Sequence, residues 1–500
     1  MSWALLRIEF VVCAWIIVLL LGDLLVPPPR KASLWKLALA GAVACGVVLG
    51  LTPIEWIGHR FQDMFVLDRF ALYFKSLSLL TVGLVIIMTR HLTASGRPST
   101  RLRLAQDDPQ QALSVKTEAR LEGSLPHPGA FYMLLFTALL GMLVLASVQD
   151  LLLLFIGLEL LTFSLYIMAA YLKTEPQAIE AGMKYLILGS VSAGFLVYGI
   201  SLLYGFAGDT SFRVLQAAIA KGPVPWTAQA GLLLIVAALG FKVAMFPFHL
   251  WVPDVYQGAP TPVVALLSVG SKIAGVAAML RVLFGVFMPL EGLWADVLAG
   301  LAAATMLYGN LGAIPQTNIK RLLGYSSIGH AGYLMMGIST ASSAGAQAVG
   351  FYALAYLLSN SAVFLVIASA ASAVGGDSLE AYNGLSRRSP LLAAVLFVGL
   401  LSLAGVPPLA GFVGKLLVLL ATMDSGRLWL VMIGALNVVV SLYYYLMVIR
   451  RAYLLAPSSS QPIVLDGLTR LTLLALCAAI LIIGVVQQPF LEQVGLALRP

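Results

Sequence analysis

Charged side chains stand in stretches of this sequence that are otherwise almost entirely apolar. Glu159 lies within LLLLFIGLELLTFSLYIMAAY, and Lys242 lies within GLLLIVAALGFKVAMFPFHLW. Lys272 and Lys415 likewise follow apolar or Pro/Gly-rich stretches. A charged side chain at the centre of a bilayer costs at least about 3 kcal/mol, so such residues usually face a hydrated interior. Acid–base chemistry, the uptake and release of protons, is what these groups could perform there.

A lysine and a carboxylate that approach and separate can load and release a proton. Desolvation favours the neutral lysine, and a nearby carboxylate favours the charged one. If Glu159 contacts Lys242, Lys242 keeps its proton; if Glu159 shifts to Lys184, Lys242 can pass its proton on. Histidine changes protonation near neutral pH and can extend the path. We therefore predict a proton relay formed by Glu159, Lys184, Lys242, Lys272, His330 and Lys415.

Other interpretations of the same residues stay open. A lysine stem can carry its ammonium to the membrane interface, which suits Lys75, shortly after Arg69, better than Lys242. A Glu–Lys pair can hold helices together without moving protons. His330 can be a buried packing residue. His249 either caps the end of a helix or lies near the cytoplasmic mouth of the path.

The composition places these residues in a polytopic all-α membrane protein. Of 500 residues, 60% are hydrophobic and only 10% are charged, and the mean hydropathy is +0.95. A spanning helix needs about 20 apolar residues, whereas barrel strands would alternate apolar and polar residues. The apolar runs predict about fourteen transmembrane helices, near 5–25, 34–53, 66–90, 129–148, 150–172, 177–206, 228–250, 260–285, 292–313, 322–340, 346–373, 389–422, 428–449 and 468–488.

Proline and glycine interrupt the seventh and twelfth of these helices. KVAMFPFHLWVPDVYQGAPTP begins at Lys242, and LAGVPPLAGFVGK ends at Lys415. Irregular backbone at this depth is tolerated only where it is buried in protein or lines a water-filled cavity. The two broken helices are five helices apart. The fifth helix, which carries Glu159, and the tenth helix, which carries His330, are also five apart. An odd repeat must insert upside down, which predicts two inverted five-helix repeats, helices 4–8 and 9–13.

The predicted helices also fix the domain organisation and the orientation. Loops after odd-numbered helices hold roughly twice as many Lys and Arg residues as the other side, so both termini are expected outside the cytoplasm. The first helix lacks a small-residue cleavage site and is expected to be retained, with a cleaved signal as the alternative. The expected segments are three N-terminal helices (1–90), a hydrophilic cytoplasmic loop (91–128), the first repeat (129–285), the second repeat (286–455), and a C-terminal helix with its tail (456–500).

Several classes of chemistry are not expected in this chain. Cys13, Cys45 and Cys477 are far apart, with no CxxC pair and no suitably spaced histidine, which argues against metal, haem or disulfide sites. Phosphate-binding loops and nucleophile elbows are also missing. The net charge of +8 is better explained by membrane orientation than by nucleic acid. Energy for transport must then come from partner subunits.

Extended motifs resemble one family closely. The run from Lys242, followed by SVGSK ending at Lys272, resembles the antiporter-like subunits of respiratory complex I. EAGMKYLILGS around Lys184, NIKRLLGYSSIGHAGY around His330 and the helix of Lys415 are most similar to the subunit N (ND2-type) family of bacterial NADH:quinone oxidoreductases. The similarity covers nearly the whole chain. Lysine at position 415 resembles subunits N and L rather than M, the long lateral C-terminal helix of L is missing, and the 91–128 loop is longer than usual.

The resemblance implies a proton-pumping subunit with fourteen transmembrane helices, two inverted repeats and no cofactor of its own. FMN and iron–sulfur clusters are then expected in partner subunits, and the neighbours in the bacterial inner membrane would be an M-type subunit and small K/J-type subunits. The roles it implies are a coupling pair, Glu159 and Lys242; a modulator, Lys184; central relay groups, Lys272 and His330; and a terminal proton-loading lysine, Lys415.

Two other functions share these sequence features. A subunit of a multisubunit cation/proton antiporter, or of a membrane-bound hydrogenase, would also carry broken helices and buried lysines, with Na⁺ in place of H⁺ as one alternative. A structural spacer with inactive ion pairs is the third interpretation. Proton pumping driven by electron transfer is the prediction that the residues and the resemblance favour together.

Overall fold

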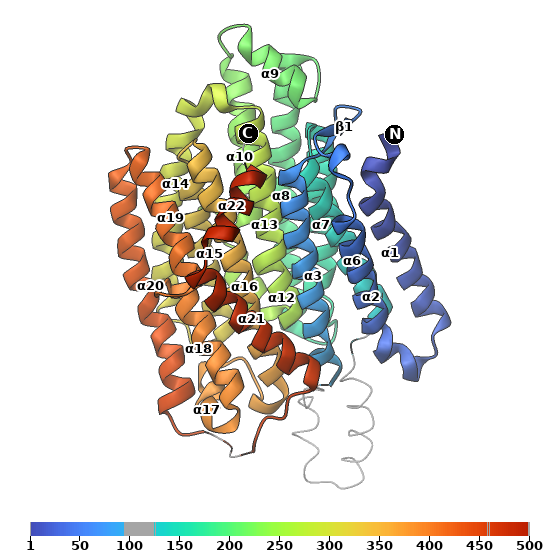
Figure 1. The fold of residues 1–500 in the computed structure, drawn as a ribbon, viewed down its shortest axis with the longest axis vertical. Coiled ribbons are helices and arrows are strands. Elements are labelled where there is room, and N and C mark those ends of the chain that lie inside the picture. The colour runs from blue at the N-terminus through green and yellow to red at the C-terminus, as the bar shows by residue number, and fades with distance from the viewer. Residues whose placement is uncertain (1, 95–124, 126, 458, 460, 499–500) are drawn as a thin grey trace.

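The computed structural model describes residues 2–94, 125, 127–457, 459 and 461–498. Long helices run side by side along the molecule (Figure 1). Among the described residues, twelve helices are long and apolar enough to cross a membrane. This confirms the predicted all-α membrane fold, while the count of fourteen helices and the inverted repeats stay predictions. The predicted loop at 91–128 lies almost entirely outside the described residues.

The N-terminal part consists of three helices and a small hairpin. Leu6 precedes α1 (Arg7–Leu25), which is followed by α2 (Leu34–Gly50) and α3 (Arg69–Ala94). Between α2 and α3, β1 (His59–Phe61) pairs antiparallel with β2 (Phe65–Leu67).

The remaining helices form the main bundle. They are α6 (Pro128–Ser147), α7 (Leu151–Ala169), α8 (Pro176–Ala207), α9 (Phe212–Ala220), α10 (Trp226–Val243), α11 (Val252–Gly258), α12 (Thr261–Leu266), α13 (Lys272–Gly285), α14 (Glu291–Ala313), α15 (Ile319–Ile338), α16 (Ser343–Val374), α17 (Leu385–Arg388), α18 (Pro390–Ala404), α19 (Ala410–Asp424), α20 (Leu428–Leu454), α21 (Gly467–Val485) and α22 (Gln488–Leu498).

Both predicted helix breaks are present. Ala244 ends α10 in the left-handed region at φ 68°, and the chain is irregular until α11 begins. Gly405 ends α18 at φ 89°, a conformation that glycine adopts without steric cost, and α19 starts at Ala410. A third irregularity was not predicted: a π-helical turn, Leu267–Ser271, joins α12 to α13 immediately before Lys272.

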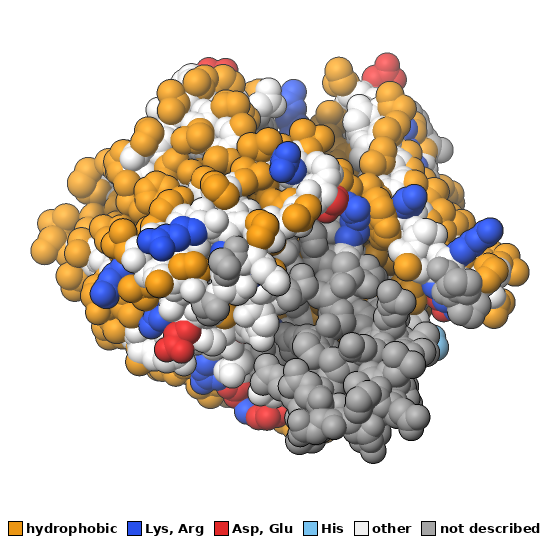
Figure 2. All heavy atoms as spheres, turned by 90° about the horizontal axis from the view of Figure 1, so that it is seen from below, with side chains coloured by type: hydrophobic (Ala, Val, Ile, Leu, Met, Phe, Trp, Pro, Cys, Tyr) orange, Lys and Arg blue, Asp and Glu red, His pale blue; other side chains and the backbone are white. Residues whose placement is uncertain are grey.

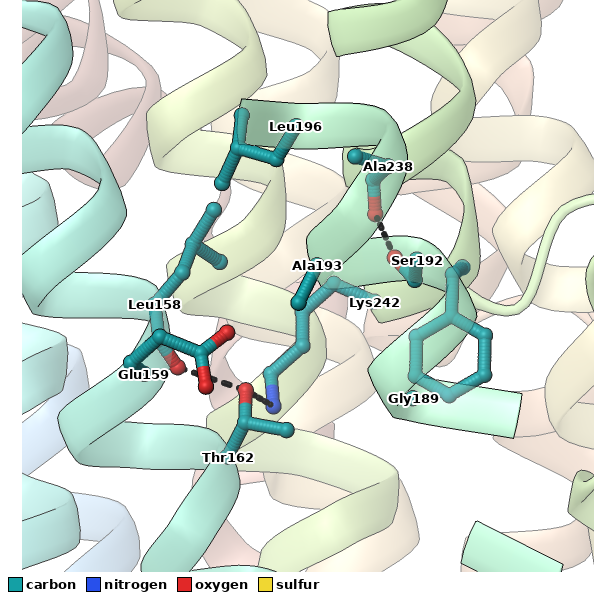
Figure 3. Close-up of a pocket in the computed structure, with 10 residues that line it drawn as sticks. Leu158, Glu159, Thr162, Gly189, Ser192, Ala193, Leu196, Ala238 and Lys242 are labelled. Atoms are coloured by element: carbon teal, nitrogen blue, oxygen red, sulfur yellow. Dashed lines mark hydrogen bonds between the residues drawn. The ribbon is translucent and has the colours of Figure 1, made fainter. Parts of the chain in front are cut away.

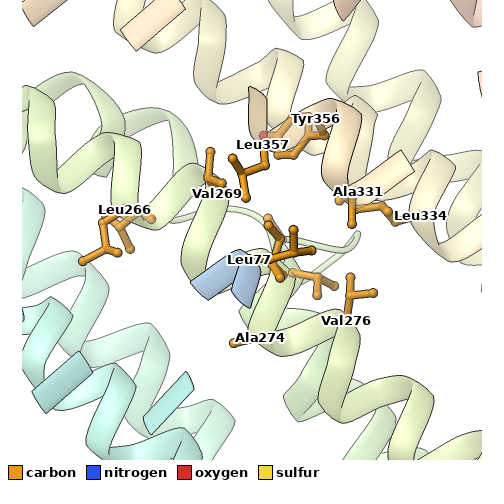
Figure 4. Packing of buried hydrophobic residues seen from close by; sticks show 14 of the residues in the cluster. Leu77, Leu266, Val269, Ala274, Val276, Ala331, Leu334, Tyr356 and Leu357 are labelled. Carbon is orange, nitrogen blue, oxygen red and sulfur yellow. The ribbon is translucent and has the colours of Figure 1, made fainter. Parts of the chain in front are cut away.

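The centre of the bundle is formed by helices that are buried on all sides. The span of α12 and α13 and the span of α16 are almost wholly enclosed by other helices. Figure 4 shows Leu77 of α3 among side chains of α12, α13, α15 and α16. Polar groups placed on these central helices are therefore shielded from lipid, which is the setting that a buried relay requires.

The two ends of the bundle differ. The start of α1 and the end of α22 lie toward one end, and α17 lies at the other (Figure 1). Figure 2, seen from the α17 end, shows Lys and Arg side chains among apolar ones. Two arginines make specific contacts: Arg388 donates to the carbonyls of Gln461 and Ala373, and Arg90 pairs with Asp466 at 2.8 Å.

Candidate functional site

Lys242 lies in the last turn of α10, next to the helix break, and its side chain is buried. Its Nζ donates to Thr162 Oγ1 of α7 at 2.8 Å and to Tyr185 OH of α8 at 3.4 Å. The Thr162 hydroxyl donates to the carbonyl of Leu158 at 2.5 Å, which leaves its oxygen available to the ammonium (Figure 3). The ammonium is therefore solvated by neutral hydroxyl groups.

Glu159 and Lys242 line the same small cavity. Figure 3 shows the carboxylate and the ammonium on two sides of this space. The centre of a water molecule can occupy about 20 Å³ of this cavity, so the cavity has room for one water molecule. Among the described residues, Glu159 has no basic group within the 4.0 Å of an ion pair. The two predicted partners thus line one small cavity without forming an ion pair.

Lys184 contacts carboxylates other than Glu159. Its Nζ lies 2.6 Å from Asp254 Oδ2 and 2.7 Å from Glu180 Oε1, and its side chain is 42% exposed. Asp254 Oδ1 also accepts from Arg321 Nη1 at 2.6 Å. The structure therefore places Lys184 in a partly exposed ion-pair cluster, and the predicted contact between Lys184 and Glu159 is not made in it.

Lys272 is the first residue of α13, directly after the π-helical turn, and is completely buried. Its Nζ donates to the backbone carbonyl of Ser327 in α15. The hydroxyl of Ser327 in turn donates to Tyr256 OH of α11 at 3.0 Å. The π-helical turn and α15 together enclose this ammonium between the two halves of the bundle.

His330 is buried on α15 between two tyrosines. Its Nδ1 lies 2.5 Å from Tyr352 OH, and its Nε2 lies 3.1 Å from Tyr445 OH. The ring centroid of Tyr356 is 4.9 Å away. Both ring nitrogens thus have hydroxyl partners, so a proton can enter on one side of the ring and leave on the other.

Lys415 lies in α19, just after the second helix break. Its Nζ donates to the carbonyl of Ala404, the last residue of α18, at a distance of 3.0 Å. The break frees this carbonyl from the helix, and the C-terminal end of a helix favours a cation. The ammonium also lies 4.8 Å from the centroid of the Tyr333 ring. The break and the lysine therefore belong to one site, as the sequence predicted.

Two further residues that the sequence drew attention to lie away from these contacts. Lys75 does not extend to the membrane interface: it is completely buried and pairs with Glu9 at 2.7 Å, so the snorkelling interpretation is wrong for it. His249 is buried in the break between α10 and α11, and its ring lies 4.1 Å from that of Tyr308.

The sequence did not predict the hydroxyl-bearing residues that surround the ionisable groups. Tyrosines in otherwise apolar helices were the available signal, because a buried tyrosine hydroxyl usually finds a hydrogen-bond partner. On α16, Tyr352 and Tyr356 are one turn apart and both lie beside His330. The hydroxyl-bearing residues that lie beside the predicted relay groups are Thr162, Tyr185, Tyr256, Ser327, Tyr352, Tyr356 and Tyr445.

Within the described part of the chain, no group of three or more His, Cys, Asp or Glu side chains could hold a metal ion. The three cysteines there are unpaired.

Comparison with known proteins places the chain in a family. Residues 148–441 match the family described as NADH:quinone oxidoreductase/Mrp antiporter, transmembrane. Over 477 residues, 95% of this chain and 93% of the relative, the sequence is 39% identical to NADH-quinone oxidoreductase subunit N of Desulforamulus reducens. The chain belongs to the subunit N family of NADH-quinone oxidoreductases. The same name is carried by a relative from Heliobacterium modesticaldum that is 40% identical over 88% of this chain and 87% of its own length.

Two solved structures share the fold of this chain. A chain of respiratory complex I from Thermus thermophilus is 32% identical and superposes with a TM-score of 0.77, covering 97% of this chain and 98% of that chain. A chain of the Mrp complex from Dietzia sp. superposes with a TM-score of 0.79 at 20% identity, covering 100% and 97%, and shares the fold. The resemblance read from the lysine motifs is therefore confirmed.

Proposed function

We propose that this chain is a proton-translocating membrane subunit of an NADH:quinone oxidoreductase, and that electron transfer in partner subunits drives protons along its buried groups. One observation carries the proposal: Lys242, Lys272 and Lys415 are buried, and among the described residues none has a carboxylate within 4.0 Å. Burying an ion without a counter-ion costs several kcal/mol. Three such groups in one membrane protein are explained by proton exchange and not by stability.

The neighbours of each group suggest the order of transfer. Lys242 stands next to Glu159 across the water-sized cavity and bonds Tyr185. Lys272 follows at the contact between α13 and α15, and His330 follows on α15 itself. Lys415 ends the series at the second helix break. Lys184 modulates the first pair from the ion-pair cluster, since Glu180 and Asp254 hold its charge close to α8 and α11.

The position of Glu159 indicates where a partner binds. Leu152, Ile156, Phe163 and Ile167 are exposed along one face of α7, and the half-buried Glu159 lies at the same helical spacing. A carboxylate open to lipid is costly at this depth. We infer that a neighbouring membrane subunit, of the M type or the small K/J type, covers this face. FMN and iron–sulfur clusters belong to other subunits, and the complex lies in the bacterial inner membrane with both termini of this chain outside.

The test is NADH-driven acidification of vesicles that contain the intact complex. Lys242→Ala and Lys415→Ala should each abolish most proton uptake, because each removes a group that the path cannot bypass. Electron transfer from NADH to an artificial acceptor that needs no membrane subunit should persist, which shows that the peripheral redox subunits are intact, and an unchanged amount of this chain in the purified complex shows that the complex is assembled. Unchanged pumping in both variants would contradict the proposal, and only the interpretation as a structural spacer would remain.

The same vesicles also test the alternative that this chain is a cation/proton antiporter subunit. The fold is shared with a chain of the Mrp complex, so a cation/proton antiporter subunit has the same architecture. An imposed Na⁺ gradient without NADH should not acidify the vesicles. Sodium-driven proton movement that Lys242→Ala abolishes would favour the antiporter.

A further inference from the structure

Asp254 binds two cations that come from different parts of the chain. Its Oδ2 lies 2.6 Å from Lys184 Nζ on α8, and its Oδ1 lies 2.6 Å from Arg321 Nη1 on α15. Arg321 also donates to Gln257 at 3.2 Å, one turn along from Asp254 on α11. A single carboxylate therefore ties α11 to one helix from each of the two predicted repeats.

The far end of α11 is held by the residue next to Arg321. Lys320 Nζ donates to the carbonyl of Ala259, directly after α11, at 3.0 Å, and it pairs with Asp377 at 2.9 Å. α11 is only 7 residues long, and a helix this short is not stable by itself. Its position is thus set by tertiary contacts, of which these charged ones are the most specific.

The aromatic residues of this segment touch the hydrogen-bond partners of two relay lysines. Trp251, which precedes α11, stacks on Tyr185 with ring centroids 4.5 Å apart, and Tyr185 OH accepts from Lys242. Tyr256 OH accepts from Ser327, whose carbonyl accepts from Lys272. α11 and the residue before it therefore contact the surroundings of both ammonium groups.

We propose that Asp254 is a positioning residue for proton transfer between Lys242 and Lys272, because its pairs with Lys184 and Arg321 hold α11 against Tyr185 and Ser327. This inference rests on the proposed function. When the carboxylate is lost, α11 shifts, and transfer slows although every relay residue is still present. Lys184 then acts on the relay through α11 and not by direct contact with Glu159.

The test compares protons pumped per NADH in vesicles with the intact complex. Asp254→Asn should lower the ratio by about twofold to tenfold, the range expected when a coupling contact is lost. Asp254→Glu should restore most of it, because the second carboxylate keeps both ion pairs. Lys184→Gln and Arg321→Gln should each give part of the loss. The matched control is Asp296→Asn, which removes the pair with Arg427 at 2.8 Å between α14 and the start of α20 and should leave the ratio unchanged.

Hydrogen exchange distinguishes positioning from general destabilisation. In Asp254→Asn, the amides of Val252–Gly258 should exchange faster, while those of α14 should not. Faster exchange throughout the chain, or unchanged exchange in α11 together with lost pumping, would overturn the inference. If Asp254→Asn pumps like the unaltered complex while Lys242→Ala does not, this inference alone fails. If Lys242→Ala also pumps normally, the proposed function itself fails.

Discussion

The three buried lysines of the proposed path are solvated by neutral oxygen atoms. Lys242 donates to two hydroxyl groups, and Lys272 and Lys415 each donate to a backbone carbonyl. A neutral acceptor stabilises an ammonium without fixing it as a carboxylate would, because its hydrogen bond is much weaker than a buried ion pair. The contrast is Lys75, which is paired with Glu9 and has no place in the proposed path.

Thr162 should be needed for pumping although it does not titrate. Thr162→Val removes the acceptor 2.8 Å from Lys242 Nζ, and a hydrogen bond to a charged group contributes about 1.5–3 kcal/mol. We expect a severalfold lower number of protons pumped per NADH in vesicles. Thr162→Ser keeps the hydroxyl and should pump normally; equal ratios for Val and Thr at this position would contradict the assignment.

The ion-pair cluster around Asp254 should not titrate near neutral pH. Burial raises the pKa of this carboxyl group, but hydrogen bonds and charge from Lys184 and Arg321 outweigh burial and hold the pKa below its ordinary value. Such a group stabilises the fold above its unfolded pKa of about 3.9, and this contribution is lost only as pH falls through the lower folded pKa. Exchange of the α11 amides, corrected for intrinsic rates, should therefore be the same at about pH 6 and about pH 8. A marked loosening at pH 6 would contradict this.

The sequence draws attention to the candidate relay residues but not to their partners. Glu159, Lys242 and His330 stand out because a charge or imidazole is rare in an apolar run. Thr162 does not, because a helical threonine commonly bonds its own backbone, and only packing shows that it also faces Lys242. The partner of Lys184 in this structure could not be predicted either, because Asp254 lies 70 residues further along the chain.

At the level of helices, the breaks were predictable and the tight contacts were not. The prolines and glycines before α11 and before α19 predicted both helix breaks. The π-helical turn before Lys272 has no proline and no sequence signal of comparable strength. Small residues at helix crossings also depend on packing. On α14, a Cβ at Gly309 would meet the backbone of Gly329 on α15, whereas a Cβ at Gly300 would meet nothing within 4 Å.

This pair of glycines provides a matched stability test. Gly309→Ala should push α14 away from α15 and destabilise the protein by about 1–3 kcal/mol, the usual cost of overpacking. Gly300→Ala, on the same helix, should be neutral or slightly stabilising, because alanine favours helix. Thermal unfolding of the purified complex is the measurement, and equal midpoints for the two variants would show that the crossing is not tight.

For the molecule as a whole, the asymmetry between its two ends predicts its orientation. Loops after the odd-numbered predicted helices hold roughly twice as many Lys and Arg residues as the other side and include Arg387 and Arg388 of α17, so the positive-inside rule predicts that the α17 end faces the cytoplasm. Cysteines introduced at Arg387, next to α18, and at Asp209, after α8, lie at exposed positions. In a background without native cysteines, a membrane-impermeant thiol reagent applied to whole spheroplasts should label Asp209→Cys only. Labelling of Arg387→Cys instead would show that the chain has the opposite orientation in the membrane.

The central claim is that proton transfer depends on buried lysines of the path and not on buried charge in general. The most direct measurement is the number of protons pumped per NADH for Lys272→Met beside the double variant Glu9→Gln/Lys75→Met, which removes an equally buried lysine together with its partner. We expect a strongly reduced ratio for Lys272→Met and the unaltered ratio for the double variant. Equal ratios in the two proteins would contradict the claim.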